Sequence, residues 1–127
     1  MSNLLTEIDK RSEEKIFEII RKDFPGHYIL SEEAGAIKQE SDFKWIIDPI
    51  DGTVNYAHSI PLTCVSIAVE KKGKIILGVV FNPISGEFFF AEKGSGSFLN
   101  DEKIAVSDCT DLRRALLVTG FPYDSSS

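Results

Sequence analysis

Two carboxylates, a glycine and a hydroxyl lie within six residues near the middle of this 127-residue chain, in the segment Asp48-Pro49-Ile50-Asp51-Gly52-Thr53. Because Asp48 and Asp51 are three residues apart, one turn can bring both carboxylates and the Ile50 carbonyl onto a hard cation such as Mg²⁺. Gly52 permits a close backbone approach, and the N–H groups of Gly52 and Thr53 can hold an anionic oxygen. The Thr53 hydroxyl can orient a water. This pattern predicts metal-dependent chemistry on a phosphate.

The same pattern, Asp-x-x-Asp-Gly, also occurs in ordinary surface turns. Its context favours a site. Residues 43–47 are apolar and rich in aromatic and β-branched side chains, which predicts a buried strand that delivers Asp48 at its end. Pro49 has no N–H to continue a strand ladder, so a turn is expected to follow.

A helix is predicted over residues 5–23, because Ile16, Ile19 and Ile20 fall on one face of it. Asp9 and Glu13 share the stripe that these isoleucines bury. An acid on a buried stripe needs a partner, which can be a metal, a hydroxyl or a backbone donor. The alternative is that Asp9 is a solvated acid of the first turn, favoured by the helix dipole.

A second acidic group follows the predicted short strand at 28–30, where Glu32 and Glu33 precede Ala-Gly. Acidic pairs in such positions are often plain loop charges. Here Glu32 lies 16 residues before Asp48, with a polar stretch at 38–42 between them. Two neighbouring strand ends could therefore converge on one cation.

The hydrophobic period changes to two after this region, which predicts an antiparallel meander. The glycines at 94–97 indicate a bend rather than a nucleotide loop, because no Gly-Lys-Ser/Thr ending follows.

Phe88, Phe89 and Phe90 are expected to pack on the face that the helix covers. His58 is expected to be a hydrogen-bonded structural residue and His27 to lie at the surface. Strands are predicted at 63–70, 74–81, 87–92 and, buried, at 115–119.

Composition excludes several classes of protein. A hydrophobic content of 43% excludes a disordered chain, and 14 basic against 20 acidic residues give a net charge of −6, which disfavours nucleic acid as a partner. There is no apolar run of about 18 residues and no basic-then-apolar leader, so we expect no membrane partner and a cytoplasmic protein. Cys64 and Cys109 are far apart and are expected to be free thiols.

Three separated elements resemble the inositol monophosphatase family of Mg²⁺-dependent, lithium-sensitive phosphatases. Residues 45–56, Trp-Ile-Ile-Asp-Pro-Ile-Asp-Gly-Thr-Val-Asn-Tyr, are similar to its first signature. Ser31-Glu32-Glu33 resembles its metal-binding Glu-Glu pair. Thr6-Glu7-Ile8-Asp9 with Glu13 resembles its Thr-x-x-Asp-x-x-x-Glu helix start. Pattern and resemblance together predict an α+β fold, with an N-terminal helix packed on a mostly antiparallel meander sheet, as part of an α/β/α layered structure.

The resemblance continues through residues 116–122 and implies that 1–127 is a single partial domain. The family's C-terminal half, with a Trp-Asp signature that supplies another metal ligand, is expected to be absent. The isolated chain is therefore expected to be weak or inactive. The complete protein is expected to be a homodimer.

The resemblance also implies a role for each candidate residue. Mg²⁺ would be the cofactor, held by Glu32, Asp48 and the Ile50 carbonyl, with Asp51 and Asp48 contacting a second ion. The catalytic residues would be Asp9 and Thr53, which orient the attacking water, and Glu33, which lies near that water. The phosphate would contact Asp51, Gly52 and Thr53.

The reaction implied is hydrolysis of inositol 1-phosphate to inositol and phosphate. Residues 54–58 are most similar to the inositol branch of the superfamily. Fructose 1,6-bisphosphate, 3′-phosphoadenosine 5′-phosphate and histidinol phosphate stay open as substrates. A noncatalytic metal-binding or dimerising domain stays open as a second class of function.

Overall fold

The computed structural model of the chain describes residues 2–120, with side chains from residue 7 onward, so the resemblance at 121–122 lies outside the described residues. Within residues 2–120, two helices and eight strands follow one another along the chain. They are α1 (Ser2–Asp23), β1 (Tyr28–Ser31), β2 (Gly35–Ile37), β3 (Phe43–Asp51), α2 (Thr53–Ala57), β4 (Cys64–Lys71), β5 (Lys74–Asn82), β6 (Glu87–Glu92), β7 (Gly96–Leu99) and β8 (Glu102–Ile104).

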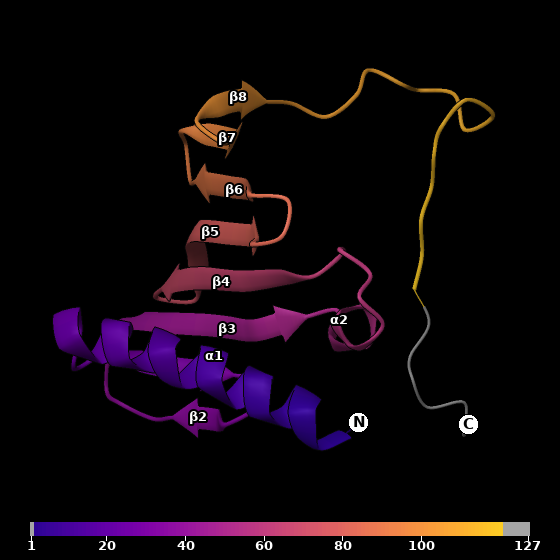
Figure 1. Cartoon of the computed structure of the whole chain (residues 1–127). Helices are drawn as coiled ribbons and strands as arrows, with labels where there is room; N and C mark the ends of the chain where they lie inside the picture. Colours follow the sequence, from indigo (N-terminus) through magenta and orange to yellow (C-terminus); the bar gives the residue numbers. More distant parts are fainter. Residues whose placement is uncertain (1, 121–127) are drawn as a thin grey trace, which may run out of the picture.

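All eight strands form one sheet in the order β2-β1-β3-β4-β5-β6-β7-β8 (Figure 1). Strands β1 and β3 run parallel, and every other neighbouring pair is antiparallel. The predicted α+β fold is confirmed, including the meander from β4 to β6. The bend predicted at 94–97 is confirmed in part: the turn lies at residues 93–95, and Gly96 and Ser97 already belong to β7. The short strands β2, β7 and β8 were not predicted from the sequence.

Helix α1 lies across one face of the sheet near β1 and β3 (Figure 1). Phe17 and Ile20 of the helix pack with Ile29 and Ile47 of the sheet in the buried core. Burying such a side chain is worth roughly 2 kcal/mol, so this contact fixes where the helix lies. The prediction for Ile19 is wrong: its side chain is 54% exposed, because the buried stripe passes through Phe17 instead.

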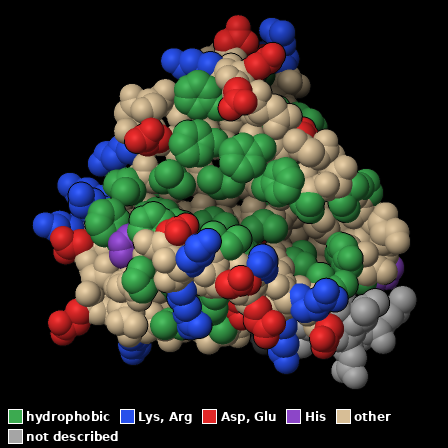
Figure 2. Space-filling model, turned by 60° about the vertical axis from the view of Figure 1, so that its left-hand side comes forward, with side chains coloured by type: hydrophobic (Ala, Val, Ile, Leu, Met, Phe, Trp, Pro, Cys, Tyr) green, Lys and Arg blue, Asp and Glu red, His purple; other side chains and the backbone are tan. Residues whose placement is uncertain are grey.

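Beyond α1 the same face of the sheet is open. Cross-strand pairing continues this face from β3 to β6: Ile47 pairs with Ile67, Ile67 with Val79, and Val79 with Phe90. A groove of about 550 Å³ lies there, and Figure 2 shows hydrophobic side chains gathered on this side of the molecule. The groove is lined by Leu77, Val79, Phe88, Phe90, Phe98 and Asp101.

The prediction for Phe88, Phe89 and Phe90 is therefore wrong. Strand alternation places Phe88 and Phe90 on the helix side, but α1 lies over β3 and does not reach them, so Phe88 is 42% exposed. Phe89 points to the opposite face. The period of a strand indicates which residues share a face, but it does not say how far a helix covers that face.

The segment 105–120 leaves β8 and runs outside the sheet without strand structure (Figure 1). The strand predicted at 115–119 is wrong, and Leu116 and Val118 are 99% and 98% exposed. Apolar, β-branched residues form a strand only beside another strand that supplies hydrogen-bond partners. Among the described residues, no strand pairs with this segment.

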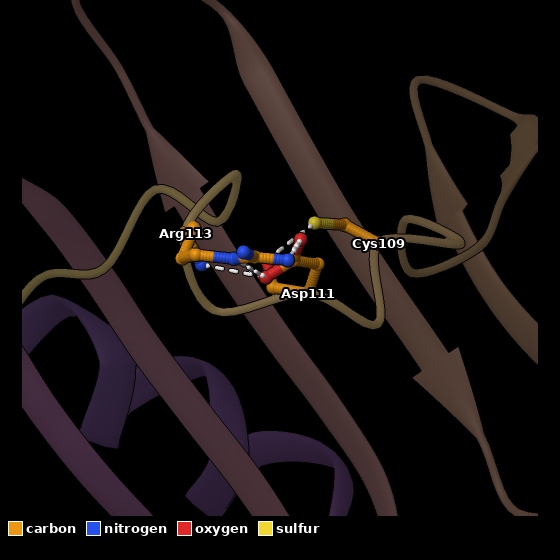
Figure 3. Close-up of polar contacts among 3 residues, drawn as sticks. All are labelled: Cys109, Asp111 and Arg113. Carbon is orange, nitrogen blue, oxygen red and sulfur yellow. Dashed lines mark hydrogen bonds and ion pairs between the residues drawn. The ribbon is translucent and has the colours of Figure 1, made fainter.

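A local turn is the main polar feature of this segment (Figure 3). The Asp111 carboxylate accepts hydrogen bonds from the backbone N–H and the guanidinium of Arg113, at 2.9–3.1 Å. These hydrogen bonds lower the pKa of Asp111. The Cys109 thiol donates to the Asp111 carbonyl. All these contacts join residues two apart, so they shape the turn without attaching it to the sheet.

Within residues 2–120, no helix combines the length and the apolar character needed to cross a membrane. Cys64 and Cys109 are both free, as predicted.

His27 is half-buried rather than at the surface, so that prediction is wrong. Its ring stacks between Phe24 and Phe43, with ring centroids 4.9 and 4.8 Å away. Its Nδ1 accepts a hydrogen bond of 3.0 Å from Trp45 Nε1. The cluster joins the end of α1 to the start of β3.

Replacing His27 by Phe should separate the two roles of this ring. Phenylalanine keeps the stacking but leaves the Trp45 N–H without its acceptor, so we expect the free energy of unfolding to fall by about 1 kcal/mol. Urea unfolding followed by Trp45 fluorescence measures this loss. Equal stability of the variant and the parent chain would show that the hydrogen bond contributes nothing.

Candidate metal and phosphate site

The one parallel strand pair of the described sheet brings the two acidic segments together. Ser31 of β1 pairs with Ile47 of β3, and the N–H of Glu32 donates to the Ile47 carbonyl at 3.1 Å. The carboxyl ends of parallel strands lie at the same edge of a sheet. Glu32 and Asp48 are the next residues on each strand, so they lie side by side, as their spacing predicts.

Asp48 shows the electrostatic cost of this arrangement. Burial, the charge of Glu32, a hydrogen bond shared with the Glu32 carboxyl and the charge of Asp51 raise the pKa of Asp48 to about 6, while the Ile50 N–H acts in the opposite direction. Carboxylates that crowd together favour either a proton or a cation between them. Both Glu32–Asp48 and Asp48–Asp51 are such pairs.

A bulge near the end of β3 places Asp48 and Asp51 on one face. Asp48 pairs with Ser66 and Asp51 with Cys64, so Pro49 and Ile50 both lie opposite Val65. In a regular strand, residues three apart point to opposite faces, and one extra residue corrects this. The strand therefore continues three residues past Asp48, where its end was predicted. Pro49 is tolerated because the bulge requires no ladder N–H from it.

Helix α1 supplies a fourth carboxylate. Asp9 is only 6% exposed, and its Oδ1 has no hydrogen-bond partner among the described residues. Burial, followed by the charges of Glu33, Glu32 and Glu13, raises its pKa. The solvated alternative for Asp9 is thus wrong. A buried carboxylate oxygen without a protein partner is rare, and a cation, a proton or a water would satisfy it.

The backbone turns sharply directly after Asp51. Gly52 has φ 84°, and a Cβ built on it would lie 2.8 Å from the Leu62 carbonyl oxygen. Asn55 Nδ2 donates to that same carbonyl at 2.8 Å and holds the turn closed. Thr53 begins α2, and no side chain caps this helix. Beside the turn lies a hollow of about 300 Å³, lined in part by Asp51, Gly52 and Cys64.

The predicted ligands come together as neighbouring pairs. In the described part of the chain, no three Asp, Glu, His or Cys side chains converge closely enough to hold one ion. The donors are carboxylate and carbonyl oxygens, which fit Mg²⁺, and Mg²⁺ commonly keeps several water ligands. The unpartnered Asp9 oxygen and the raised pKa of Asp48 each fit a positive charge nearby.

Two other polar residues differ from this group in role. His58 is exposed, and its Nδ1 lies 2.8 Å from the Val54 carbonyl, so it is the structural residue that was predicted. Ser12 was not predicted to belong to the site; its hydroxyl donates to the Pro49 carbonyl at 2.9 Å. Its position three residues after Asp9 on the helix was the available signal.

Replacing Gly52 by Ala should cost more stability than replacing Gly73 by Ala. Both glycines have positive φ, 84° and 78°, but nothing lies within 4 Å of a Cβ at Gly73. We expect about 1 kcal/mol for Gly73→Ala from backbone strain, and at least about 2 kcal/mol for Gly52→Ala because the Leu62 carbonyl must also move. Chemical unfolding of both variants checks this, and equal losses would contradict the close approach.

The stability of the metal-free chain should fall as pH rises from about 4 to about 7. The pKa of Asp48 is raised from 3.8 to about 6 on folding, so its contribution is fully present below about pH 4 and is lost as pH rises through about 6. We expect a loss of about 1 kcal/mol, discounted for the solvent screening of a half-exposed carboxylate. Asp48→Asn should reduce this loss, whereas Asp108→Asn should not. Urea unfolding in EDTA measures it; an unchanged loss in Asp48→Asn would contradict this origin.

Comparisons with known proteins agree with this geometry. The model of the inositol monophosphatase family matches residues 1–127. Nus factor SuhB of Pasteurella multocida is 46% identical over 123 residues, covering 96% of this chain and 46% of that protein. Inositol-1-monophosphatase of Synechocystis is also 46% identical, over 96% of this chain and 43% of that protein.

The structure of inositol monophosphatase from Anabaena superposes with a TM-score of 0.86 at 46% identity, over 91% of this chain and 46% of that chain. The chain spans a little under half the length of the curated relatives it matches. Sequence, fold and the order of the acidic segments lead to one conclusion: the chain belongs to the inositol monophosphatase family.

Proposed function

We propose that this chain carries the metal- and phosphate-binding part of a Mg²⁺-dependent hydrolase of phosphate monoesters. The observation that supports this most directly is the placement of Glu32, directly after β1, beside Asp48 of the parallel strand β3, where the pKa of Asp48 is raised to about 6. The unpartnered Asp9 oxygen on α1 is a second buried acceptor that a cation would satisfy. Membership of the inositol monophosphatase family gives the reaction class.

A phosphate cannot approach this cluster of carboxylates unless a cation reverses the local field. In the proposal, Glu32, Asp48 and the Ile50 carbonyl would hold one Mg²⁺, and Asp51 with Asp48 would hold a second. Bound Mg²⁺ lowers the pKa of a coordinated water and offsets the negative charge of the phosphate.

The remaining residues position the reactants. Asp9 and the Thr53 hydroxyl would orient the attacking water, and Asp9 would accept its proton through the unpartnered Oδ1. Glu33 would lie near the same water. The N–H groups of Gly52 and Thr53 would donate to phosphate oxygens, beside Asp51, in the turn that Gly52 closes.

We propose inositol 1-phosphate as the substrate. Residues 54–58 resemble the inositol branch, and the Synechocystis relative is named inositol-1-monophosphatase. The alternatives are fructose 1,6-bisphosphate, 3′-phosphoadenosine 5′-phosphate and histidinol phosphate. By the same resemblance we propose lithium sensitivity, a homodimer of the complete protein and a cytoplasmic location. Binding of nucleic acid is not part of the proposal, because the net charge of −6 disfavours it.

A second candidate is a binding domain without turnover. The Pasteurella multocida relative is named as a Nus factor, so the fold also occurs under a name that describes no hydrolysis. The open groove on the sheet and the exposed apolar segment 105–120 are surfaces that a partner could cover. Metal binding and self-association, without phosphate release even when a C-terminal half is added, would favour this candidate.

Asp48→Asn tests the proposed site, with Asp108→Asn as the matched control on the exposed 105–120 segment. We expect the Mg²⁺ affinity of the purified chain, measured by calorimetry, to fall at least about tenfold in Asp48→Asn and to stay unchanged in Asp108→Asn. Unchanged affinity in Asp48→Asn would refute the assignment.

Phosphate release is then measured on the four candidate substrates with the same three proteins. Any activity should be highest on inositol 1-phosphate and should be lost in Asp48→Asn. The isolated chain is expected to be weak, so the assay is repeated with a C-terminal half from a relative added. A higher rate on another substrate would replace inositol 1-phosphate in the proposal.

A further inference from the structure

Two adjacent residues of helix α1, Ser12 and Glu13, form hydrogen bonds to the two segments that carry the acids. Ser12 donates its hydroxyl hydrogen to the Pro49 carbonyl at 2.9 Å, on the segment that carries Asp48. Glu13 reaches the other segment: its Oε2 accepts from the Ala34 N–H at 3.0 Å and from the Ser31 hydroxyl.

The two donors to Glu13 bracket the acidic pair. Ser31 is the last residue of β1, and Ala34 is the last residue of the turn before β2, so Glu32 and Glu33 lie between them. Glu13 is 6% exposed and Ser31 3% exposed, whereas Glu32 and Glu33 are exposed. One buried carboxylate oxygen therefore holds both ends of the turn and leaves the two acids between them free to face outward.

Holding this turn with a carboxylate has an electrostatic cost. It adds a buried negative charge close to Asp9, whose own ionisation Glu13 opposes. Hydrogen bonds to a charged acceptor are stronger and shorter than those to a neutral one, which gives a stiffer turn. Stiffness matters here because Mg²⁺ tolerates little deviation in the geometry of its ligands.

We propose that Glu13 is a positioning residue that fixes the Glu32–Glu33 turn in register with Asp48 for cation binding. The inference rests on the proposed function, because register with Asp48 affects activity only if a cation is held there. Glu13 itself touches neither the cation nor the phosphate in this proposal. Its effect passes through Ser31 and Ala34.

The first test needs no metal. Amide hydrogen exchange of Ala34 is measured by NMR in the parent chain, Glu13→Ala, Glu13→Gln and Glu14→Ala. Exchange should become at least about fivefold faster in Glu13→Ala, because the acceptor of the Ala34 N–H is lost. Glu13→Gln keeps an acceptor oxygen and should retain most of the protection. Glu14 is exposed and serves as the matched control. Unchanged Ala34 exchange in Glu13→Ala would overturn the inference.

The second test is Mg²⁺ affinity by calorimetry, at a temperature where circular dichroism shows every variant folded. We expect Glu13→Ala to bind at least about tenfold more weakly, Glu13→Gln to recover to within about threefold, and Glu14→Ala to match the parent. A purely structural Glu13 would lower the melting temperature and leave the affinity of the folded protein unchanged, which would also overturn the inference.

Two further outcomes, a variant that does not fold and a parent chain that does not bind Mg²⁺, each have their own experiment. If Glu13→Ala does not fold, Ser31→Ala replaces it, because that variant keeps the buried carboxylate and its bond to Ala34 and should show an intermediate loss of affinity. If the parent chain does not bind Mg²⁺, the proposed function fails, and Ala34 exchange still decides whether Glu13 positions the turn.

Discussion

The parallel pairing of β1 with β3 is the constraint on which the candidate site depends. It is the one parallel pair in the described sheet, and it places Ser31 opposite Ile47. A shift of this register by one residue would turn the side chains of β1 to the other face. Ile29 would then leave the core, so the hydrophobic contact with α1 and the placement of Glu32 are specified by the same residues. Core packing therefore fixes the position of Glu32, although placing its carboxylate beside that of Asp48 is itself unfavourable.

Folding also brings like charges together at this site, which has an electrostatic cost. Six acids from α1, the turn after β1 and the end of β3 lie near one another, and burial raises the pKa of both Asp9 and Asp48. Offsetting interactions come from neutral donors: the Ser31 hydroxyl, the Ala34 N–H and the Ser12 hydroxyl. These donors hold the backbone and the supporting acid, and leave the outward carboxylates without a counter-charge. That distribution is typical of a site prepared for a cation.

Local patterns in the sequence predicted the elements that depend on local order. Alternation along residues 63–92 indicated the meander, and the spacing of Asp9 and Glu13 placed both acids on the buried stripe of the helix, with a solvated Asp9 as the alternative. Non-local contacts were missed: the extent of α1 over the sheet, which leaves Phe88 exposed, and the lack of a neighbouring strand for residues 115–119. The bulge at Pro49 was missed as well, because it is defined by the partner strand. It is nevertheless what puts the two aspartates of the segment on one face.

The open groove over β5 to β7 affects how this chain behaves in solution. Leu77, Phe88, Phe90 and Phe98 present aromatic and aliphatic surface in the folded state, and Leu116 and Val118 add more from the 105–120 segment. Environment-sensitive dyes that fluoresce on hydrophobic surface respond to such areas whether or not a protein is unfolded. The native chain should therefore give a high dye signal at low temperature. Its melting is better followed by backbone circular dichroism or by Trp45 than by a dye-based thermal shift.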